Sequence, residues 1–282
     1  MNYMSIDWSS PDTPDTIQPT LEDEDSFGNS MALNQAGDLA IFGASGDNID
    51  SENVGAGAVY IYERTGNNSW SQRGDPITPS SRNAGDNFGS TVAMNAAGDY
   101  IAVSAPFYDH VGALSTDNEG RIYIFKYNGS TWDEKSVTLI QGTPQSADSL
   151  GQYSITMNDA GTVVAAGTAD YDNVNNDPAV NADGRVVIFT TTDDWSSHNT
   201  YYITPPADGN AGRFGRALSL NDDGDILVVG ESQYEGEGET DTGRAHVYSV
   251  TTATNWSSPT TETTLRAATP IDNSWFGESV AI

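Results

Sequence analysis

The feature that most constrains the fold is an internal repeat. A Phe-Gly dipeptide, replaced once by Leu-Gly, recurs at a nearly constant interval along the chain. Its five copies are Phe27-Gly28, Phe88-Gly89, Leu150-Gly151, Phe214-Gly215 and Phe276-Gly277. A tryptophan recurs independently at almost the same interval, at Trp8, Trp70, Trp132, Trp195 and Trp256. Two markers with one period indicate a tandem array in which each unit packs on its neighbours.

Each unit has the pattern of four short β-strands. Large and small residues alternate after the Phe-Gly, as in Val92-Ala93-Met94, and a turn with asparagine and glycine follows. A second apolar strand, such as 100–104, leads through a polar loop to a strand opened by glycine, such as 120–125, and the tryptophan strand comes last. No stretch shows a sustained helical period. The predicted fold class is therefore all-β: antiparallel four-stranded blades of about 62 residues, arranged as a β-propeller.

The repeat also predicts how the chain is organised. We expect one propeller array over residues 1–282, with full repeats at 27–87, 88–149, 150–213 and 214–275. Partial repeats flank them: an outer strand of a partial blade in 1–26 and the first strand of a further blade in 276–282. This count of strands predicts either a fragment of a longer propeller, or a last blade that is incomplete or completed by a neighbour.

The motifs resemble the FG-GAP repeat, which builds the propeller of integrin α-subunits and of many bacterial surface proteins. The Phe-Gly half is present five times, and the strand Gly57-Ala-Val-Tyr-Ile-Tyr62 has the expected form of the third strand. The Gly-Ala-Pro half is degenerate and reads Gly43-Ala44-Ser45, Ser104-Ala105-Pro106, Gly167-Thr168-Ala169 and Gly230-Glu231-Ser232. The resemblance implies a recognition or adhesion propeller, although a fold shared by many proteins does not define one function.

Composition excludes several classes of partner. The chain carries 40 acidic residues against 11 Lys and Arg, a formal net charge of −29. A nucleic-acid binder needs a basic face, and anionic membranes attract basic segments, so we expect neither partner. No apolar run is long enough to cross a membrane, and the absence of cysteine excludes disulfides and thiolate metal sites.

Calcium is the one cofactor for which the sequence offers candidate ligands. The family resemblance implies calcium loops between the first two strands of a blade, where several carboxylates converge. Here those turns are shorter than the family's loop, and only Asp222, Asp223 and Asp225 form an acidic cluster. Because Ca²⁺ requires six to eight oxygen ligands, we favour a simple turn stabilised by asparagine over a metal site at this position.

The loops between the second and third strands are richer in acids. The best candidate is the third, where Asp170, Asp172, Asn175 and Asp177 lie within eight residues. A solvated acidic loop without metal is the alternative interpretation. Arg121, Arg185 and Arg244 follow the glycine that opens the third strand, and we expect each to form an ion pair or bidentate clamp that orders the acidic loop of its own blade.

Two further residue types bear on function. The repeated tryptophans could be sugar-stacking platforms, but their fixed register favours packing against the adjoining blade. The three histidines, His110, His198 and His246, fall at non-equivalent repeat positions, and no catalytic motif occurs. The sequence therefore predicts a non-enzymatic protein.

The leading hypothesis is an extracellular propeller, or one at a cell or particle surface, that mediates adhesion or protein recognition through its loop face. A lectin-type propeller with a glycan ligand is the second hypothesis. An architectural module of an extracellular filament or virion is the third.

Overall fold

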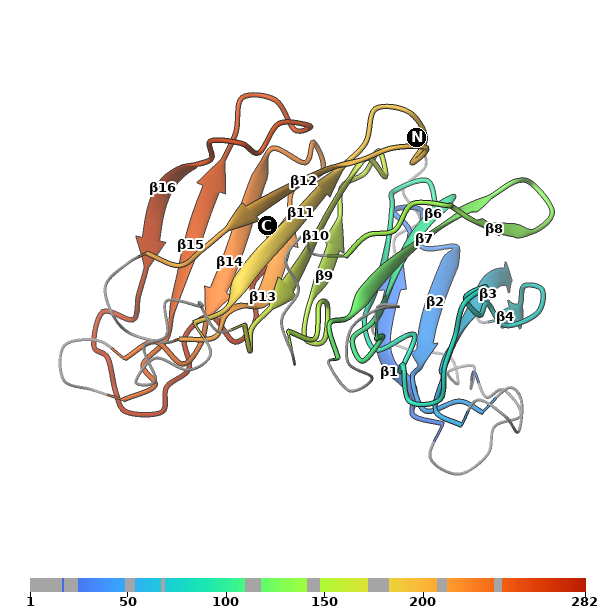
Figure 1. Ribbon diagram of the computed structural model, residues 1–282, viewed down its shortest axis with the longest axis horizontal. Coiled ribbons are helices and arrows are strands. Elements are labelled where there is room, and N and C mark those ends of the chain that lie inside the picture. Colours follow the sequence, from blue (N-terminus) through green and yellow to red (C-terminus); the bar gives the residue numbers. More distant parts are fainter. Residues whose placement is uncertain are drawn as a thin grey trace.

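The computed structural model contains four antiparallel sheets. It describes residues 17, 25–48, 54–66, 69–109, 118–140, 148–171, 183–206, 212–235 and 240–282, and these residues form strands and no helix. Each sheet has four strands that follow one another in chain order, so every sheet is a meander. The four sheets are arranged as the blades of a four-blade β-propeller, which confirms the predicted fold class (Figure 1).

The blades are numbered in chain order. Blade 1 consists of β1 (Phe27–Leu33), β2 (Leu39–Ala44), β3 (Ala58–Gly66) and β4 (Ser69–Gln72). Blade 2 consists of β5 (Val92–Met94), β6 (Tyr100–Ala105), β7 (Arg121–Tyr127) and β8 (Trp132–Glu134). Blade 3 consists of β9 (Ile155–Met157), β10 (Val163–Thr168), β11 (Arg185–Thr190) and β12 (Asn199–Ile203). Blade 4 consists of β13 (Phe214–Leu220), β14 (Ile226–Glu231), β15 (Arg244–Ser249) and β16 (Thr260–Leu265).

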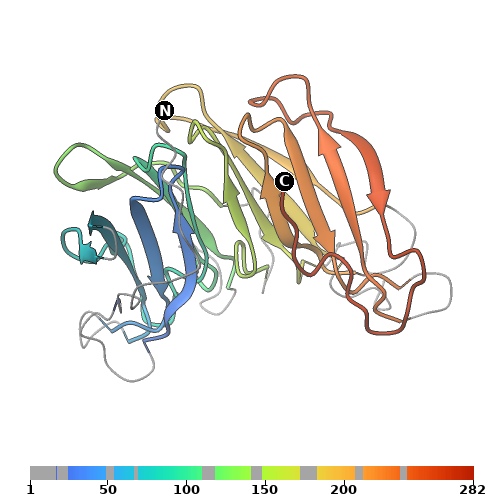
Figure 2. The same cartoon turned by 180° about the vertical axis from the view of Figure 1, so that it is seen from behind.

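The blades stand side by side in an arc. The first strands of successive blades contact one another in the order β1, β5, β9 and β13. Blades 1 and 4 lie at opposite ends of the molecule, and the arc is open between them (Figures 1 and 2). On the outer side of blade 1 the side chains of Met31 and Leu33 in β1 are 59% and 52% exposed. The apolar core has one cluster at each junction between neighbouring blades and a fourth cluster within blade 1, which includes Tyr60 and Tyr62.

The repeated Phe-Gly forms the joint between one blade and the next. The N–H of Phe88, at the entry to blade 2, donates to the carbonyl of Ala56 just before β3 of blade 1, at 2.8 Å. The equivalent bonds at the later junctions run from Leu150 to Glu119, from Phe214 to Asp183 and from Phe276 to Thr242. The side chains of Phe88, Leu150 and Phe214 are fully buried, whereas Phe27, in the end blade, is only partly buried.

Glycines make this joint possible because two backbones approach too closely for a side chain. A Cβ at Gly57, which precedes β3, would collide with the backbone of Phe88, and a Cβ at Gly43 in β2 would collide with the carbonyl of Gly89. Gly89 itself has a φ of 92°, a conformation that side chains disfavour. The Phe-Gly of one blade and the glycines of the preceding blade are therefore the two sides of one contact.

In two blades the repeated tryptophan does not lie in the fourth strand, where the sequence predicted it. Trp70 and Trp132 lie in β4 and β8, as predicted, but Trp195 and Trp256 lie in the hairpins that precede β12 and β16. These hairpins are longer, so the ring folds back into the core: both side chains are at most 1% exposed, and Trp195 Nε1 donates to the carbonyl of Gly161 at 2.7 Å. The prediction that every repeated tryptophan begins the outer strand is therefore wrong for these two.

Candidate functional site

Two sets of connections, at opposite ends of the blades, differ in how much their lengths vary. The turns from the first to the second strand, here called the turn face, all span five residues: 34–38, 95–99, 158–162 and 221–225. The connections from the second to the third strand, here called the loop face, are longer and differ in length: 45–57, 106–120, 169–184 and 232–243. The first-to-second-strand turns are therefore uniform in length, and the second-to-third-strand connections are not.

An asparagine fixes each turn of the turn face. In blade 2 the Oδ1 of Asn95 accepts the N–H groups of Asp99 and Tyr100 at 3.0 and 2.9 Å, and its Nδ2 donates to Asp99 at 2.8 Å. Asn34, Asn158 and Asn221 make the same type of contact in their own turns. Such bonds to the backbone are the reason that asparagine favours turns.

Backbone hydrogen bonds also join the turns to one another. The N–H of Gln35 donates to the carbonyl of Ala96, that of Ala96 to Asp159, and that of Asp159 to Asp222, at 3.1, 3.3 and 3.1 Å. The turn face is thus a continuous ladder across all four blades. This leaves little freedom for its turns to rearrange around a ligand.

The acidic cluster in the fourth turn has the geometry of such a turn. Asp225 Oδ1 accepts from Asn221 at 2.9 Å, while the side chains of Asp222 and Asp223 are exposed. Partial burial, together with the negative charges of Asp222 and Asp223, raises the pKa of the nearby Asp159. No three His, Cys, Asp or Glu side chains of the described residues are grouped as metal ligands. Calcium binding by Asp222, Asp223 and Asp225 stays a prediction.

Only one of the four candidate ligands in the third loop is described. Asp170 contacts Arg213 Nε at 3.4 Å and accepts a hydrogen bond from the Tyr153 hydroxyl at 3.0 Å. Both of its carboxylate oxygens therefore already have partners. Asp172, Asn175 and Asp177 lie outside the described residues, so this calcium site also stays a prediction.

The repeated arginines hold the start of each long loop through an aromatic ring. Arg121, Arg185 and Arg244 are all buried, with at most 9% exposure. Their guanidinium groups lie over the rings of Tyr108, Tyr171 and Tyr234, at 5.5, 3.9 and 3.6 Å from the ring centroids. Each tyrosine stands three residues after the end of the second strand. This arrangement buries the stacked cation and fixes the first residues of the loop.

Sequence reasoning expected these arginines to bind acids of the loop and missed the tyrosines. The signal was present, because the tyrosines recur at one repeat position. Blade 1 departs from the pattern at both positions together: Ala58 replaces the arginine and Asp47 replaces the tyrosine. There the Tyr60 hydroxyl donates to Asp47 at 2.5 Å, and burial raises the pKa of Tyr60 well above its usual range, so the phenol keeps its proton.

Blade 4 adds a buried polar triad to its arginine. Glu231 accepts from Arg244 Nε and Nη2 at 2.5 and 3.1 Å, and His246 Nε2 lies 2.8 Å from the same carboxylate. The other ring nitrogen of His246 contacts Thr264 Oγ1 at 3.1 Å. The side chains of Glu231 and His246 are fully buried and that of Arg244 is 2% exposed, so no substrate has access to this triad.

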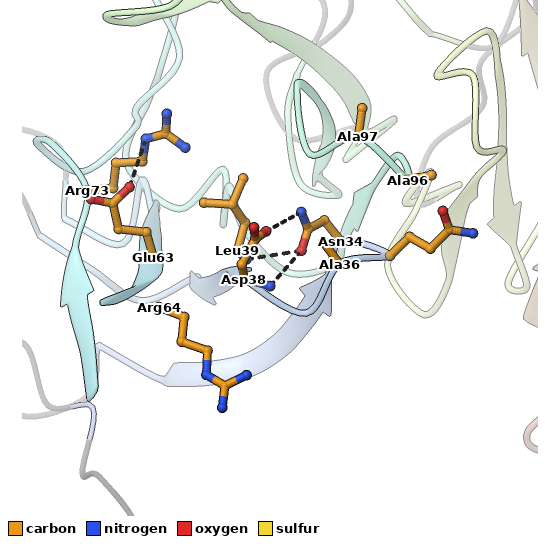
Figure 3. Close-up of a pocket in the computed structure, with 10 residues that line it drawn as sticks. Asn34, Ala36, Asp38, Leu39, Glu63, Arg64, Arg73, Ala96 and Ala97 are labelled. Atoms are coloured by element: carbon orange, nitrogen blue, oxygen red, sulfur yellow. Dashed lines mark hydrogen bonds and ion pairs between the residues drawn. The ribbon is translucent and has the colours of Figure 1, made fainter. Parts of the chain in front are cut away.

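Two neighbouring hollows lie between blades 1 and 2. The first, of about 440 Å³, is lined by the turns of both blades and by Glu63, Arg64 and Arg73 (Figure 3). Arg73 and Glu63, which both line it, form an ion pair at 3.6 Å. The second, of about 360 Å³, shares Arg73 and extends to the β7–β8 hairpin.

Comparison with known proteins agrees with the resemblance seen in the sequence. Residues 70–125 match the FG-GAP repeat, and they run from β4 of blade 1 to β7 of blade 2 across one joint. The fold is that of a β-propeller, and this segment of it is similar to the FG-GAP repeat. Among solved structures, the chain is similar to the β-propeller domain of Cps50 (Swd1) from Myceliophteria thermophila, with 12% identity and a TM-score of 0.49. That alignment covers 90% of this chain and 59% of the other. No curated protein matches the sequence, and none of the described residues forms a helix long and apolar enough to cross a membrane.

Proposed function

We propose that the protein is a non-enzymatic recognition module that binds a protein partner through its loop face, at a cell surface, a particle surface or in the extracellular space. The observation that carries the proposal is the contrast between two sets of connections: the first-to-second-strand turns are short, uniform and tied into a ladder, whereas the second-to-third-strand connections are long and of unequal length. Variable loops on a rigid scaffold are the usual place for binding residues.

The first residues of each long loop support the proposal, because contacts within the protein already hold them in place without a partner. In blades 2, 3 and 4 a buried arginine stacks on the tyrosine at the beginning of the loop, and in blade 1 a buried tyrosine–aspartate bond takes its place. Fixing the base of a loop lowers the entropy that binding must remove, so more of the contact energy is available for affinity.

The negative charge of the protein favours a partner with a basic surface. The sequence of the loops is rich in acids, with Glu235, Glu237, Glu239 and Asp241 in the fourth loop alone. With a net charge of −29, the protein should associate fastest with a partner that presents a basic surface. Nucleic acid is disfavoured by the same charge.

The environment of two histidines supports a non-enzymatic role. His246 is enclosed with Glu231 and Arg244, and the ring of His198 packs against Phe189 at 5.9 Å, where burial lowers its pKa. His110 lies outside the described residues. His246 contacts the hydroxyl of Thr264 at 3.1 Å, but the histidine ring itself is fully buried.

Two variants with the same loss of charge test the proposal on opposite faces. The loop-face variant carries Glu235→Gln, Glu237→Gln and Glu239→Gln, and the turn-face control carries Asp159→Asn, Asp222→Asn and Asp223→Asn. Both are screened with the wild type against an array of purified extracellular proteins. We expect the binding partners of the wild type to be retained by the control and weakened about tenfold or more in the loop-face variant. Equal binding by all three proteins would contradict recognition through the loop face.

A further inference from the structure

A hollow of about 360 Å³ lies on the side of the array away from the loop face, where the segment after β4 passes the β7–β8 hairpin. Its volume falls in the range of about 300 to 1,000 Å³ that is typical of small-molecule sites. Its lining combines three aromatic rings, one arginine and several hydroxyl groups, among them Arg73, Thr78, Tyr127, Ser130, Thr131 and Trp132.

The aromatic part of the lining is specific to blade 2. The rings of Tyr127 and Trp132 lie 5.4 Å apart at an angle of 48°. Trp132 Nε1 is buried, so the accessible part of this partly buried side chain is the carbon surface of the indole. At the same repeat position Trp195 and Trp256 are fully buried in their hairpins. Trp70 is partly exposed like Trp132, but its cross-strand neighbour is Arg64, whereas that of Trp132 is Tyr127.

The polar rim is held in place before any ligand binds. Asn128 accepts the N–H groups of Ser130 and Thr131 at 2.9 Å each and donates to Asp133 at 2.9 Å, which fixes the hairpin. Thr78 Oγ1 accepts a hydrogen bond from Arg82 at 2.7 Å and keeps its own hydroxyl hydrogen to donate. Together these groups offer both donors and acceptors around an apolar surface.

Charge excludes an anionic ligand from this hollow. Its arginine, Arg73, is already engaged: it pairs with Glu63 at 3.6 Å and lies over the Tyr127 ring at 4.2 Å. Asp75 adds a negative charge to the lining, and the whole chain is strongly acidic. The remaining chemistry suits a neutral molecule that has both apolar C–H faces and many hydroxyl groups.

We infer that this hollow is a binding subsite for a neutral saccharide, with a sugar ring placed against the Trp132–Tyr127 surface and its hydroxyls bonded to Ser130 and Thr78. The Thr131 hydroxyl is already bonded to Asn128 at 2.8 Å and to Asp133 at 3.3 Å. The inference does not depend on the proposed protein recognition, because the hollow is separate from the loop face. The adjoining hollow at Arg73 offers room for a further sugar unit.

Saturation-transfer NMR with defined sugars tests the inference. The probes are glucose, galactose, mannose and N-acetylglucosamine at millimolar concentration, with glucuronic acid as the anionic comparison. We expect transfer from protein aromatic protons to the ring protons of at least one neutral sugar, and weaker transfer to glucuronic acid. Absence of transfer to every neutral sugar, or a preference for the anion, would overturn the inference.

Matched variants locate the binding. Trp132→Leu removes the indole but keeps an apolar side chain, and Trp70→Leu is the control at the same repeat position, outside the hollow. We expect Trp132→Leu to bind about tenfold more weakly and Trp70→Leu to bind like the wild type. Ser130→Ala changes an exposed hydroxyl and spares the core, so it keeps the test valid if Trp132→Leu does not fold; it should weaken binding severalfold. Unchanged affinity in both hollow variants would contradict the assignment.

Discussion

Asp86 shows how a single carboxylate at a joint affects stability. Its side chain lies two residues before the buried Phe88 and is only 3% exposed. Burial raises its pKa to about 6, the charge of Asp109 adds to the increase, and the hydrogen bond from the backbone of Asn83 opposes it. The folded protein therefore holds this proton more tightly than the unfolded chain, whose pKa is about 3.9. Ionisation between about pH 4 and pH 6 then lowers the free energy of unfolding.

We predict that Asp86→Asn raises the melting temperature at pH 8, where the aspartate is charged, and leaves it nearly unchanged at pH 4. An amide keeps the oxygen that accepts from Asn83 and removes the buried charge. Thermal melts of both proteins across this pH range test the prediction, with the exposed Asp75→Asn as control. A gain that is the same at pH 4 and pH 8 would rule out the charge as its cause.

The buried triad of blade 4 gives a second residue-level prediction. Glu231→Ala leaves the Arg244 guanidinium buried without its carboxylate, and His246 loses the same partner. Removing one partner of a buried pair typically costs about 3 to 5 kcal/mol, so we expect a loss of that size in urea unfolding. Glu235→Ala, in the adjoining loop, is the control. A loss below about 1 kcal/mol would mean that the triad is not held as described.

At the scale of elements, the contact between blades predicts that replacing phenylalanines at the same repeat position destabilises the protein by unequal amounts. Phe88 is fully buried between blades 1 and 2, whereas Phe27 is only partly buried in the end blade. Phe88→Ala should destabilise by about 3 to 5 kcal/mol, the usual cost for a buried ring, and Phe27→Ala by clearly less. Denaturant unfolding of the two variants measures the difference. Equal losses would contradict the unequal packing of the two rings.

The strands could be predicted from the sequence because alternation and turn chemistry are local signals. Val92 and Met94, the turn after them and the glycine-opened third strand each identify an element without knowledge of its neighbours. The position of Trp195 in a hairpin could not be predicted, because it depends on whether the core has room for the ring beside that longer hairpin. The turn with asparagine that the sequence favoured at 221–225 is also local: Asn221 bonds the backbone and the side chain of Asp225 within its own turn.

The candidate site was only partly predictable for a related reason. The buried arginines were found from their repeat position, but their partners were expected to be acids of the loop. Tyr171 and Tyr234 were overlooked because stacking leaves no charge signature in a sequence. The sugar-binding hollow required two blades to be placed side by side, since Arg73 and Tyr127 come from different repeats.

At the scale of the whole molecule, net charge is the main general influence on stability. Forty acidic residues against eleven Lys and Arg repel one another, and added salt screens that repulsion. We predict that the melting temperature rises with NaCl and rises equally in CaCl₂ of the same ionic strength. A larger rise in calcium that is lost in Asp172→Ala would instead place a metal site in the third loop. Asp172 is the better probe because Asp170 already contacts Arg213 and Tyr153.

The central claim is that each Phe-Gly joins its blade to the preceding one, and a pair of glycines tests it directly. Gly28 and Gly89 occupy the same repeat position with φ of 79° and 92°, so alanine costs a similar backbone strain at both, on the order of 1–2 kcal/mol. A Cβ at Gly28 meets no atom of the described residues within 4 Å, whereas at Gly89 it lies 2.6 Å from the carbonyl oxygen of Ala58 in blade 1.

Urea unfolding of Gly28→Ala and Gly89→Ala is the decisive measurement. We predict that Gly89→Ala is less stable than Gly28→Ala by about 1 to 3 kcal/mol, the usual cost of forcing an extra group into a packed contact. Equal losses in the two variants would contradict the joint on which this description of the array rests.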